Sequence, residues 1–404
     1  MLAPLELIRE SSQAAWLAEY VPGWRKVPLY HDALQAGDFS QLPVMGKKEL
    51  RQNFPHNFLP PGQNLDTLLE NKLVEMEHSS GTSEDRTAVL FGRGWWDEQE
   101  ERVLRLNPFV AGVLDEYPEA RRVTIVPPVC NGLVCFSNYN ALSARIAGRT
   151  LFANQARIPF LVTEAELARM ALETIDWAPQ FLDLDPVQGA WFALYCERHG
   201  IRFPSVKFIL CSYEFVSVVH QRILERVFGV PVLNLYGSTE TGHLLMENER
   251  GEMKPATSAV YYEIIDADEQ GVGELIVTTL TNDIMPLLRY RVGDLVERAG
   301  SEYVVHGRAR DALRRSDGRR VTTLEVDRCF EGVTGMVHYQ LRQTGDGQFA
   351  LQWIADGTGP AAPELAALKA RLDELLQPAA PLSLEQVTLL PPTPSGKFRL
   401  TCRT

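Results

Sequence analysis

In the middle of the chain, two short apolar runs enclose a stretch with helical periodicity. Residues 206–210 and 230–235 are rich in Val, Ile and Leu, which is typical of β-strands. Between them, the apolar residues of 218–229 recur at three- and four-residue intervals, and the stretch closes on a glycine. A further strand-like run lies at 123–126. This alternation predicts an α/β fold.

With 404 residues, the chain is longer than one hydrophobic core usually organises. We expect a large N-terminal α/β domain over residues 1–308. It includes a β subdomain, because residues 260–265 and 273–279 are strand-like and are separated by a polar turn. A small, mobile α+β domain is expected over 309–404.

The C-terminal domain is predicted from its leucine spacing. Leucines recur at three- and four-residue intervals over 365–376, which indicates an amphipathic helix. Strands are expected on either side of it, at 349–354 and 386–390. Arginines become frequent over 308–320, and we place a hinge there, at Arg310.

Charge and composition exclude several classes of partner. A formal net charge of −12 disfavours binding to nucleic acid or to an anionic membrane surface. The N-terminal residues lack a secretory signal pattern, and no apolar run approaches the roughly 20 residues of a membrane helix. The six cysteines are scattered without metal-binding spacing. We therefore expect a cytoplasmic protein, monomeric or homodimeric, with no nucleic acid or membrane partner.

A first candidate binding segment is rich in hydroxyl groups. It follows the strand-like run 73–77 and consists of Ser79, Ser80, Gly81, Thr82 and Ser83. Hydroxyls and free backbone N–H groups in such a loop could wrap a polyphosphate. The segment lacks the Gly-Lys-Ser/Thr of a Walker loop, and on its own it could equally be a surface turn.

A more specific segment directly follows the strand at 230–235. It contains Tyr236, Gly237, Ser238, Thr239 and Glu240. An aromatic ring could stack on a purine, a hydroxyl could bind phosphate, and the carboxylate of Glu240 could hold Mg²⁺. The alternative is that these residues cap a helix.

Four segments together resemble, in their order along the chain, the core motifs of the acyl- and aryl-CoA synthetase superfamily of adenylate-forming enzymes. They are residues 236–242, 289–295, 307–318 and 392–397. The stretches 27–30 and 42–50 resemble the phenylacetate-CoA ligase branch of that superfamily. The resemblance covers nearly the whole chain.

The resemblance implies roles for individual residues. Lys397, in Pro394-Ser395-Gly396-Lys397, matches the mobile catalytic lysine, which would act with Thr239 and Glu240. Asp294 matches the aspartate that binds the ribose hydroxyls of ATP, and Arg308 matches an arginine that contacts the nucleotide. The segment that would bind adenine is Ser212, Tyr213 and Glu214.

Family position also implies where the carboxylic acid binds. The pocket is expected near Cys130, Asn131, Gly132, Tyr213 and Tyr236. These residues would suit a flat aromatic acid with a polar substituent, but they could equally be packing and turn residues. The phosphate loop departs from the family pattern, because Glu84 and Asp85 stand where Gly and Lys are usual.

The expected reaction has two steps. A small carboxylic acid and MgATP would give an acyl-adenylate and pyrophosphate, and a thiol would then give a thioester. The thiol would be coenzyme A or the phosphopantetheine of an acyl carrier protein. The arginines of 308–320 could attract either one, or could simply form a solvated, charged hinge. Two alternatives stay open: an amide ligase that uses the same adenylate, and an inactive nucleotide-binding relative.

Overall fold

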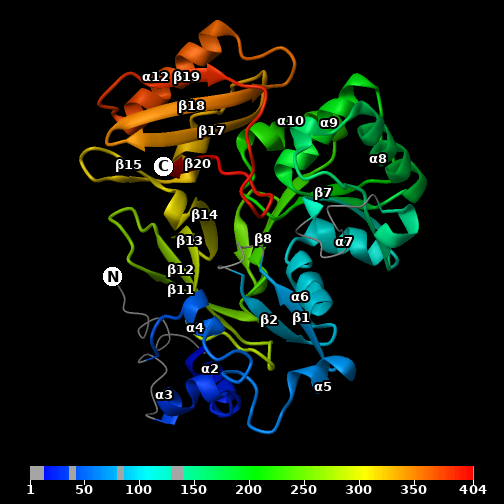
Figure 1. The fold of residues 1–404 in the computed structure, drawn as a ribbon, viewed down its shortest axis with the longest axis vertical. Helices are drawn as coiled ribbons and strands as arrows, with labels where there is room; N and C mark the ends of the chain where they lie inside the picture. The colour runs from blue at the N-terminus through cyan, green and yellow to red at the C-terminus, as the bar shows by residue number, and fades with distance from the viewer. Residues whose placement is uncertain (1–12, 36–41, 80–85, 129–139, 404) are drawn as a thin grey trace. The chain divides into compact units, whose positions relative to one another are not determined.

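The computed structural model describes residues 13–35, 42–79, 86–128 and 140–403 (Figure 1). The chain divides into two compact units. The first unit comprises residues 1–104, 237–245 and 254–303, and the second unit comprises residues 105–236, 246–253 and 304–404. Both units combine helices and strands, so the predicted α/β fold class is confirmed. The domain boundary expected at residue 308 stays a prediction.

A parallel sheet forms the centre of the second unit. Its strands are β3 (Arg122–Ile125), β5 (Thr150–Phe152), β6 (Phe181–Leu184), β7 (Phe208–Cys211) and β8 (Val232–Ser238), with β4 (Ile146–Ala147) at one edge. They lie in the order β5, β3, β6, β7, β8. Every residue of β6 and β7 is buried, as expected of parallel strands that are covered on both faces. The strands predicted at 206–210 and 230–235 are therefore confirmed.

The helices of the second unit begin at side chains that accept hydrogen bonds from the first turn. They are α7 (Pro108–Glu116), α8 (Glu164–Trp177), α9 (Pro186–Arg198) and α10 (Val218–Phe228), and their capping residues are Asn107, Thr163, Asp185 and Ser217. The predicted helix at 218–229 is α10. It ends at Gly229, whose φ of +65° lies in the left-handed region that favours glycine.

A second, four-stranded sheet lies in the C-terminal part of the second unit. Its order is β19, β18, β17, β20, and Figure 1 shows α12 along it. The elements of this part are β15 (Leu313–Arg314), β16 (Arg320–Val321), α11 (Thr323–Arg328), β17 (Met336–Gly345), β18 (Gln348–Ala355), α12 (Ala362–Leu376), β19 (Ser383–Gln386) and β20 (Thr401–Arg403). Leu368, Leu372 and Leu376 are buried, which confirms the predicted amphipathic helix.

The strand expected at 386–390 is displaced toward the N-terminus. The structure places β19 at Ser383–Gln386, where it pairs in parallel with β18. Val387 still donates its N–H to the carbonyl oxygen of Trp353 in β18, and the chain then leaves the sheet ahead of Pro391 and Pro392, which have no N–H to contribute to a strand ladder.

The first unit contains the predicted β hairpin. Strand β11 (Val260–Ile265) pairs antiparallel with β12 (Gly273–Thr279), which also pairs with β13 (Tyr290–Ala299). The other elements of this unit are α2 (Gln13–Trp24), α3 (His31–Gln35), α4 (Lys47–Arg51), α5 (Leu65–Glu70), β1 (Val74–His78), β2 (Ala88–Gly92) and α6 (Trp95–Leu104).

The remaining elements are short helices and three strands. They are the 3₁₀ helices η1 (Pro28–Tyr30), η4 (Leu142–Arg145), η5 (Pro159–Leu161) and η6 (Ala309–Asp311), and the strands β9 (Gly242–Glu247), β10 (Met253–Pro255) and β14 (Glu302–Arg308). Within the part of the chain that the structure describes, no helix combines the length and apolar character needed to cross a membrane.

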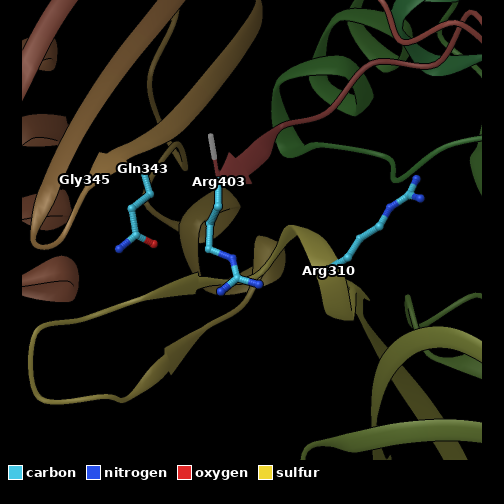
Figure 2. Close-up of a pocket in the computed structure, with 4 residues that line it drawn as sticks. All are labelled: Arg310, Gln343, Gly345 and Arg403. Carbon is cyan, nitrogen blue, oxygen red and sulfur yellow. The ribbon is translucent and has the colours of Figure 1, made fainter.

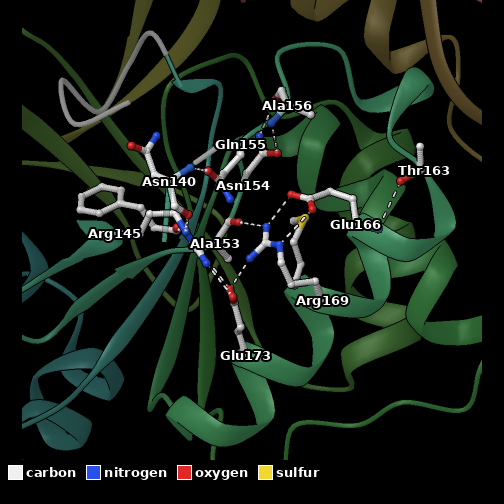
Figure 3. A network of polar contacts seen from close by, with 12 residues as sticks. Asn140, Arg145, Ala153, Asn154, Gln155, Ala156, Thr163, Glu166, Arg169 and Glu173 are labelled. Atoms are coloured by element: carbon white, nitrogen blue, oxygen red, sulfur yellow. Dashed lines mark hydrogen bonds and ion pairs between the residues drawn. The ribbon is translucent and has the colours of Figure 1, made fainter. Parts of the chain in front are cut away.

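A buried arginine joins η4 to α8 in the second unit (Figure 3). Arg145 is 1% exposed, and its guanidinium donates to both carboxylate oxygens of Glu173 at 2.9 and 2.6 Å. It also donates to the carbonyl oxygens of Asn140 and Phe152. Burial alone would raise the pKa of Glu173, but the hydrogen bonds from Arg145 and Arg169 hold it below its usual value.

Replacing this carboxylate should destabilise the fold. We expect Glu173→Gln to lower the free energy of unfolding at neutral pH by roughly 2 kcal/mol, between the values typical of exposed and fully buried pairs. The pKa of Glu173 is lower in the folded state than in the unfolded chain, so its stabilising contribution is lost as pH falls through the folded-state pKa. The stability difference between wild type and variant, measured by urea unfolding, should therefore shrink in acid.

A matched control is Glu119→Gln. The Glu119 side chain is 89% exposed and lies 3.2 Å from Arg149, so its loss should cost less than about 1 kcal/mol at any pH. Equal losses in the two variants would show that the Arg145 network does not stabilise the protein as a buried ion pair.

Candidate functional site

The loop after β7 carries three of the predicted binding residues. Ser212, Tyr213 and Glu214 lie at the carboxyl end of a parallel strand, where α/β folds bind ligands. The Ser212 hydroxyl donates to Asp183 at 3.0 Å, and the Tyr213 hydroxyl lies 3.4 Å from the other oxygen of that carboxylate. Tyr213 has a φ of +73°, and such strained backbone is concentrated at functional sites.

The predicted catalytic lysine lies against this loop, within the same unit. Lys397 Nζ donates to the main-chain carbonyl oxygen of Tyr213 at 2.6 Å. The next residue, Phe398, donates its N–H to Glu214 Oε1 at 2.8 Å. Lys397 and Phe398 are thus hydrogen-bonded to Tyr213 and Glu214, two consecutive residues of the predicted adenine segment.

The turn that carries Lys397 is itself held in place. Gly396 has a φ of +87°, and the carbonyl oxygen of Lys397 accepts hydrogen bonds from Thr393 N–H at 2.7 Å and from the Thr393 hydroxyl at 2.8 Å. Arg157 donates to the carbonyl oxygens of Thr393 and Pro394. The Pro-Ser-Gly-Lys motif therefore forms a closed turn whose lysine points to the β7 loop.

Asp185 lies beside Glu214, although the sequence pattern did not single it out. It caps α9, with Oδ1 accepting the N–H groups of Val187 at 3.1 Å and Gln188 at 2.9 Å. Burial raises the pKa of Asp185 to about 6. Burial and the neighbouring Asp185 charge raise the pKa of Glu214 well above its usual value. The Lys397 ammonium acts in the opposite direction on the pKa of Asp185 and on that of Glu214. The sequence signal for Asp185 was an Asp-Pro pair, which indicates only a helix start.

Buried polar contacts join the C-terminal sheet to α10. Asp327 of α11 accepts hydrogen bonds from Val218 N–H at 2.9 Å and from the hydroxyls of Ser217 and Tyr339. His220 Nε2 of α10 lies 3.2 Å from His338 Nδ1 of β17.

Both histidines are fully buried, and burial lowers the pKa of His220 to about 3 and holds that of His338 well below its usual value. The histidine pair is therefore neutral at physiological pH, with one ring donating to the other. These contacts fix the sheet that carries the lysine segment.

The first unit holds the predicted Mg²⁺ carboxylate. Glu240 is 4% exposed, and its Oε1 lies 2.8 Å from Lys47 Nζ. Burial would raise the pKa of Glu240, but the Lys47 ammonium lowers it, so the group stays ionised. No sequence signal identified Lys47 as its partner. Thr239, the neighbouring predicted catalytic residue, is half-buried.

The carboxyl-terminal end of β8 requires glycine at residue 237, where it approaches the start of β9 closely. A Cβ on Gly237 would lie 2.4 Å from the carbonyl oxygen of Gly242, so no side chain fits there. The Ser238 hydroxyl lies 2.9 Å from that of Thr241 and is engaged within the turn. Tyr236, at the preceding position of β8, is half-buried.

Three further predicted residues lie within the described part of the chain: Ser79, Asp294 and Arg308. Ser79 is buried, and its hydroxyl accepts the N–H of Thr87 at 3.0 Å. Asp294 is buried within β13, and Arg308 is the last residue of β14. Nine further residues discussed above lie outside the described part of the chain: Ser80, Gly81, Thr82, Ser83, Glu84, Asp85, Cys130, Asn131 and Gly132.

The predicted hinge residue lines a cavity of about 410 Å³ in the second unit (Figure 2). Arg310 of η6, Gln343 and Gly345 of β17, and Arg403 of β20 form its walls. The side chain of Arg310 is 67% exposed and lies 3.8 Å from Asp311. Figure 2 shows the Arg403 side chain beside Gln343, whereas the side chain of Arg310 extends away from both.

A magnesium ion that arrives with a nucleotide would have to compete with the Lys47 ammonium for the Glu240 carboxylate. Mg²⁺ is usually held by one or two carboxylates together with substrate phosphates and water. In the described ranges, no group of three or more His, Cys, Asp or Glu residues could hold a metal by itself. Glu240 would therefore supply the protein ligand.

Two curated proteins resemble the chain in sequence. One is Protein CapK of Staphylococcus aureus, 23% identical over 271 residues, which cover 65% of this chain and 55% of that protein. The other is phenylacetate-coenzyme A ligase of Aromatoleum evansii, 25% identical over 311 residues, which cover 72% of this chain and 64% of that protein. The chain thus spans between half and two thirds of the length of these relatives. No protein-family model matches it.

Solved structures resemble the chain over most of its length. A 2-hydroxyisobutyryl-CoA ligase in the postadenylation state, in complex with R3-HIB-AMP, matches with a TM-score of 0.64 and 16% identity over 93% of this chain and 85% of that one. An anthranilate CoA ligase in complex with anthranoyl-AMP matches with a TM-score of 0.60 and 14% identity over 80% of this chain and 65% of that one. The resemblance inferred from the motifs is confirmed at this level: the chain has the fold of the adenylate-forming acyl- and aryl-CoA ligases.

Proposed function

We propose that the protein is an ATP-dependent acid–thiol ligase that forms an acyl-adenylate. In the first step, a carboxylate oxygen of the acid attacks the α-phosphorus of ATP, and pyrophosphate leaves. In the second step, the sulfur of a thiol attacks the acyl carbon, AMP leaves, and the thiol proton is released to solvent. The products are a thioester, AMP and pyrophosphate.

The position of Lys397 carries this proposal. A fold alone does not specify a reaction. Here, however, a lysine in a Pro-Ser-Gly-Lys turn lies 2.6 Å from the carbonyl oxygen of Tyr213, at the ligand-binding edge of the parallel sheet. An ammonium group there would stabilise the charge that builds between the acid oxygen and the α-phosphate.

The other predicted residues are proposed to bind the nucleotide. Tyr236 would stack on adenine, Asp294 would accept hydrogen bonds from the ribose hydroxyls, and Arg308 would contact the nucleotide. Glu240 would hold Mg²⁺, which when bound neutralises phosphate charge. The hydroxyl loop of 79–83 would contact the β- and γ-phosphates.

The substrates are proposed as an aromatic acid and a phosphate-bearing thiol. Aromatic acids are named for two of the similar proteins, and Tyr213 and Tyr236 offer flat apolar surface. For the thiol, the phosphates of coenzyme A or phosphopantetheine would bind Arg403 at the cavity and the exposed Arg310 beside it.

The direct test is pyrophosphate release from MgATP across a panel of aryl and short-chain acids. We expect release that depends on the acid and is greatest for one aryl class, followed by thioester formation when coenzyme A or a phosphopantetheine thiol is added. Adenylate that reacts with amines and with no thiol would instead identify an amide ligase. ATP binding without acid-dependent release would refute the proposal and favour a nucleotide-binding protein.

A further inference from the structure

Two buried carboxyl groups, Asp185 and Glu214, lie next to the segment that carries Lys397 and Phe398. Their contacts limit how many protons the pair can hold. Asp185 is 0% exposed, and both backbone hydrogen bonds from the start of α9 go to its Oδ1. Its second oxygen, Oδ2, has no hydrogen-bond donor among the described groups. The Glu214 and Asp185 carboxyl groups interact as side-chain hydrogen-bond partners.

Two carboxylates in this position cannot both be ionised and bonded to each other. An ionised carboxylate only accepts hydrogen bonds, so the Asp185–Glu214 contact needs a proton on one of the pair. Like charges in direct contact and removed from water strongly favour that proton. One shared proton supplies the missing donor and leaves a single negative charge.

The single negative charge of the Asp185–Glu214 pair matches the single positive charge of the Lys397 ammonium. The Lys397 ammonium acts on both Asp185 and Glu214, and Phe398 N–H donates to Glu214 Oε1 at 2.8 Å. We propose that Asp185 and Glu214 share one proton, and that the one negative charge left on the pair seats Lys397 for the adenylation step. Both are positioning residues, and the inference rests on the function proposed above.

Two other charged residues near the Asp185–Glu214 pair, Asp183 and Arg157, have hydrogen-bond partners of their own. Asp183, at the end of β6, is bonded to Ser212 and lies beside the Tyr213 hydroxyl. Arg157 donates to main-chain carbonyls of the lysine turn. In acid the pair takes up a second proton and becomes neutral, so the attraction for Lys397 is lost. Because burial raises the pKa of Asp185 to about 6, adenylation should fall as pH drops through that region.

Replacing each carboxyl by the amide of the same shape tests the effect of its charge without changing the packing. Glu214→Gln and Asp185→Asn each remove one carboxyl, keep one negative charge, and provide an amide N–H in place of the shared proton. We expect each to lose less than about tenfold in the adenylation rate. The acid limb of the pH profile should move to lower pH in Glu214→Gln, because the amide N–H favours ionised Asp185.

The double variant Asp185→Asn/Glu214→Gln keeps the shape and carries no charge. We expect it to lose about 10²-fold in the adenylation rate with little change in the KM of ATP, as if Lys397 were absent. The control Asp115→Asn/Glu119→Gln removes two exposed carboxylates from the same unit and should stay within about twofold.

A second readout does not depend on activity. Hydrogen exchange of the Phe398 amide, followed in the full chain, reports whether the lysine segment is seated. We expect exchange to be faster in the double variant than in either single variant. Equal exchange and equal rates in the double and single variants would overturn the inference. If wild type releases no pyrophosphate, the proposed function fails, and the exchange measurement still decides whether the pair seats the lysine.

Discussion

Lys397→Ala should lower the rate of adenylation by about 10²-fold or more, the scale observed when a charge-stabilising donor is removed from an active site. The ammonium group lies at the carboxyl end of β7, bonded to the Tyr213 carbonyl oxygen, where the acid and the α-phosphate would meet. Because Lys397 is partly exposed, its removal should leave the fold intact. The measurement is single-turnover pyrophosphate release from MgATP and acid.

The loss should be confined to the first step. When preformed acyl-adenylate is supplied, thioester formation by Lys397→Ala should match wild type. Lys369→Ala is a suitable control, because Lys369 is a partly exposed lysine of α12 that pairs with Asp373 within the same helix. A raised KM with an unchanged kcat would mean that Lys397 only binds substrate and does not stabilise the transition state.

Glu240→Gln should also lower adenylation by about 10²-fold, because it removes the carboxylate proposed to hold Mg²⁺ beside the phosphates. The amide keeps the size of the side chain but binds Mg²⁺ far more weakly than a carboxylate does. Saturation with Mg²⁺ should therefore require a higher concentration in the variant. The measurement is pyrophosphate release across a Mg²⁺ titration at saturating ATP.

The variant should remain folded. Its partner Lys47 retains 38% exposure and can be hydrated once the ion pair is lost, so the Tm should change little. Glu274→Gln is the matched control in the first unit, because Glu274 pairs with Arg291 at 2.9 Å near the surface. An unchanged Mg²⁺ dependence in Glu240→Gln would assign Glu240 to holding Lys47 and not to binding metal.

The fold was predictable wherever pattern and pairing agree. The hairpin of β11 and β12 has the bounds predicted from alternation and a polar turn, and α10 ends at the predicted glycine. The strand β19 was misplaced because its limits depend on pairing with β18, whose partner residues lie 33 positions earlier, as Ala350 does to Ser383. The residues of β19 alone do not determine its register with β18.

The site was predictable only in its named motifs. The Pro-Ser-Gly-Lys turn and the β7 loop were each identifiable, and the structure brings Lys397 and Phe398 into contact with that loop. Asp185 and Lys47 escaped notice because their significance lies in distant partners: Glu214 for one, and Glu240 for the other. A carboxylate that caps a helix and one that shares a proton have the same sequence signature.

The hydrogen bond between Lys397 and residue 213 has a consequence for how such a protein can diversify. The acceptor is a main-chain carbonyl, which every amino acid possesses, whereas the Tyr213 side chain is proposed to face the acid. Exchanging that side chain can therefore change which acid is selected without moving the lysine. Residues that tolerate a positive φ, such as Asn or Gly, are the most permissive replacements. If the proposed function holds, selectivity and catalytic competence are encoded in separate atoms of one residue, and the choice of acid can change while the chemistry is retained.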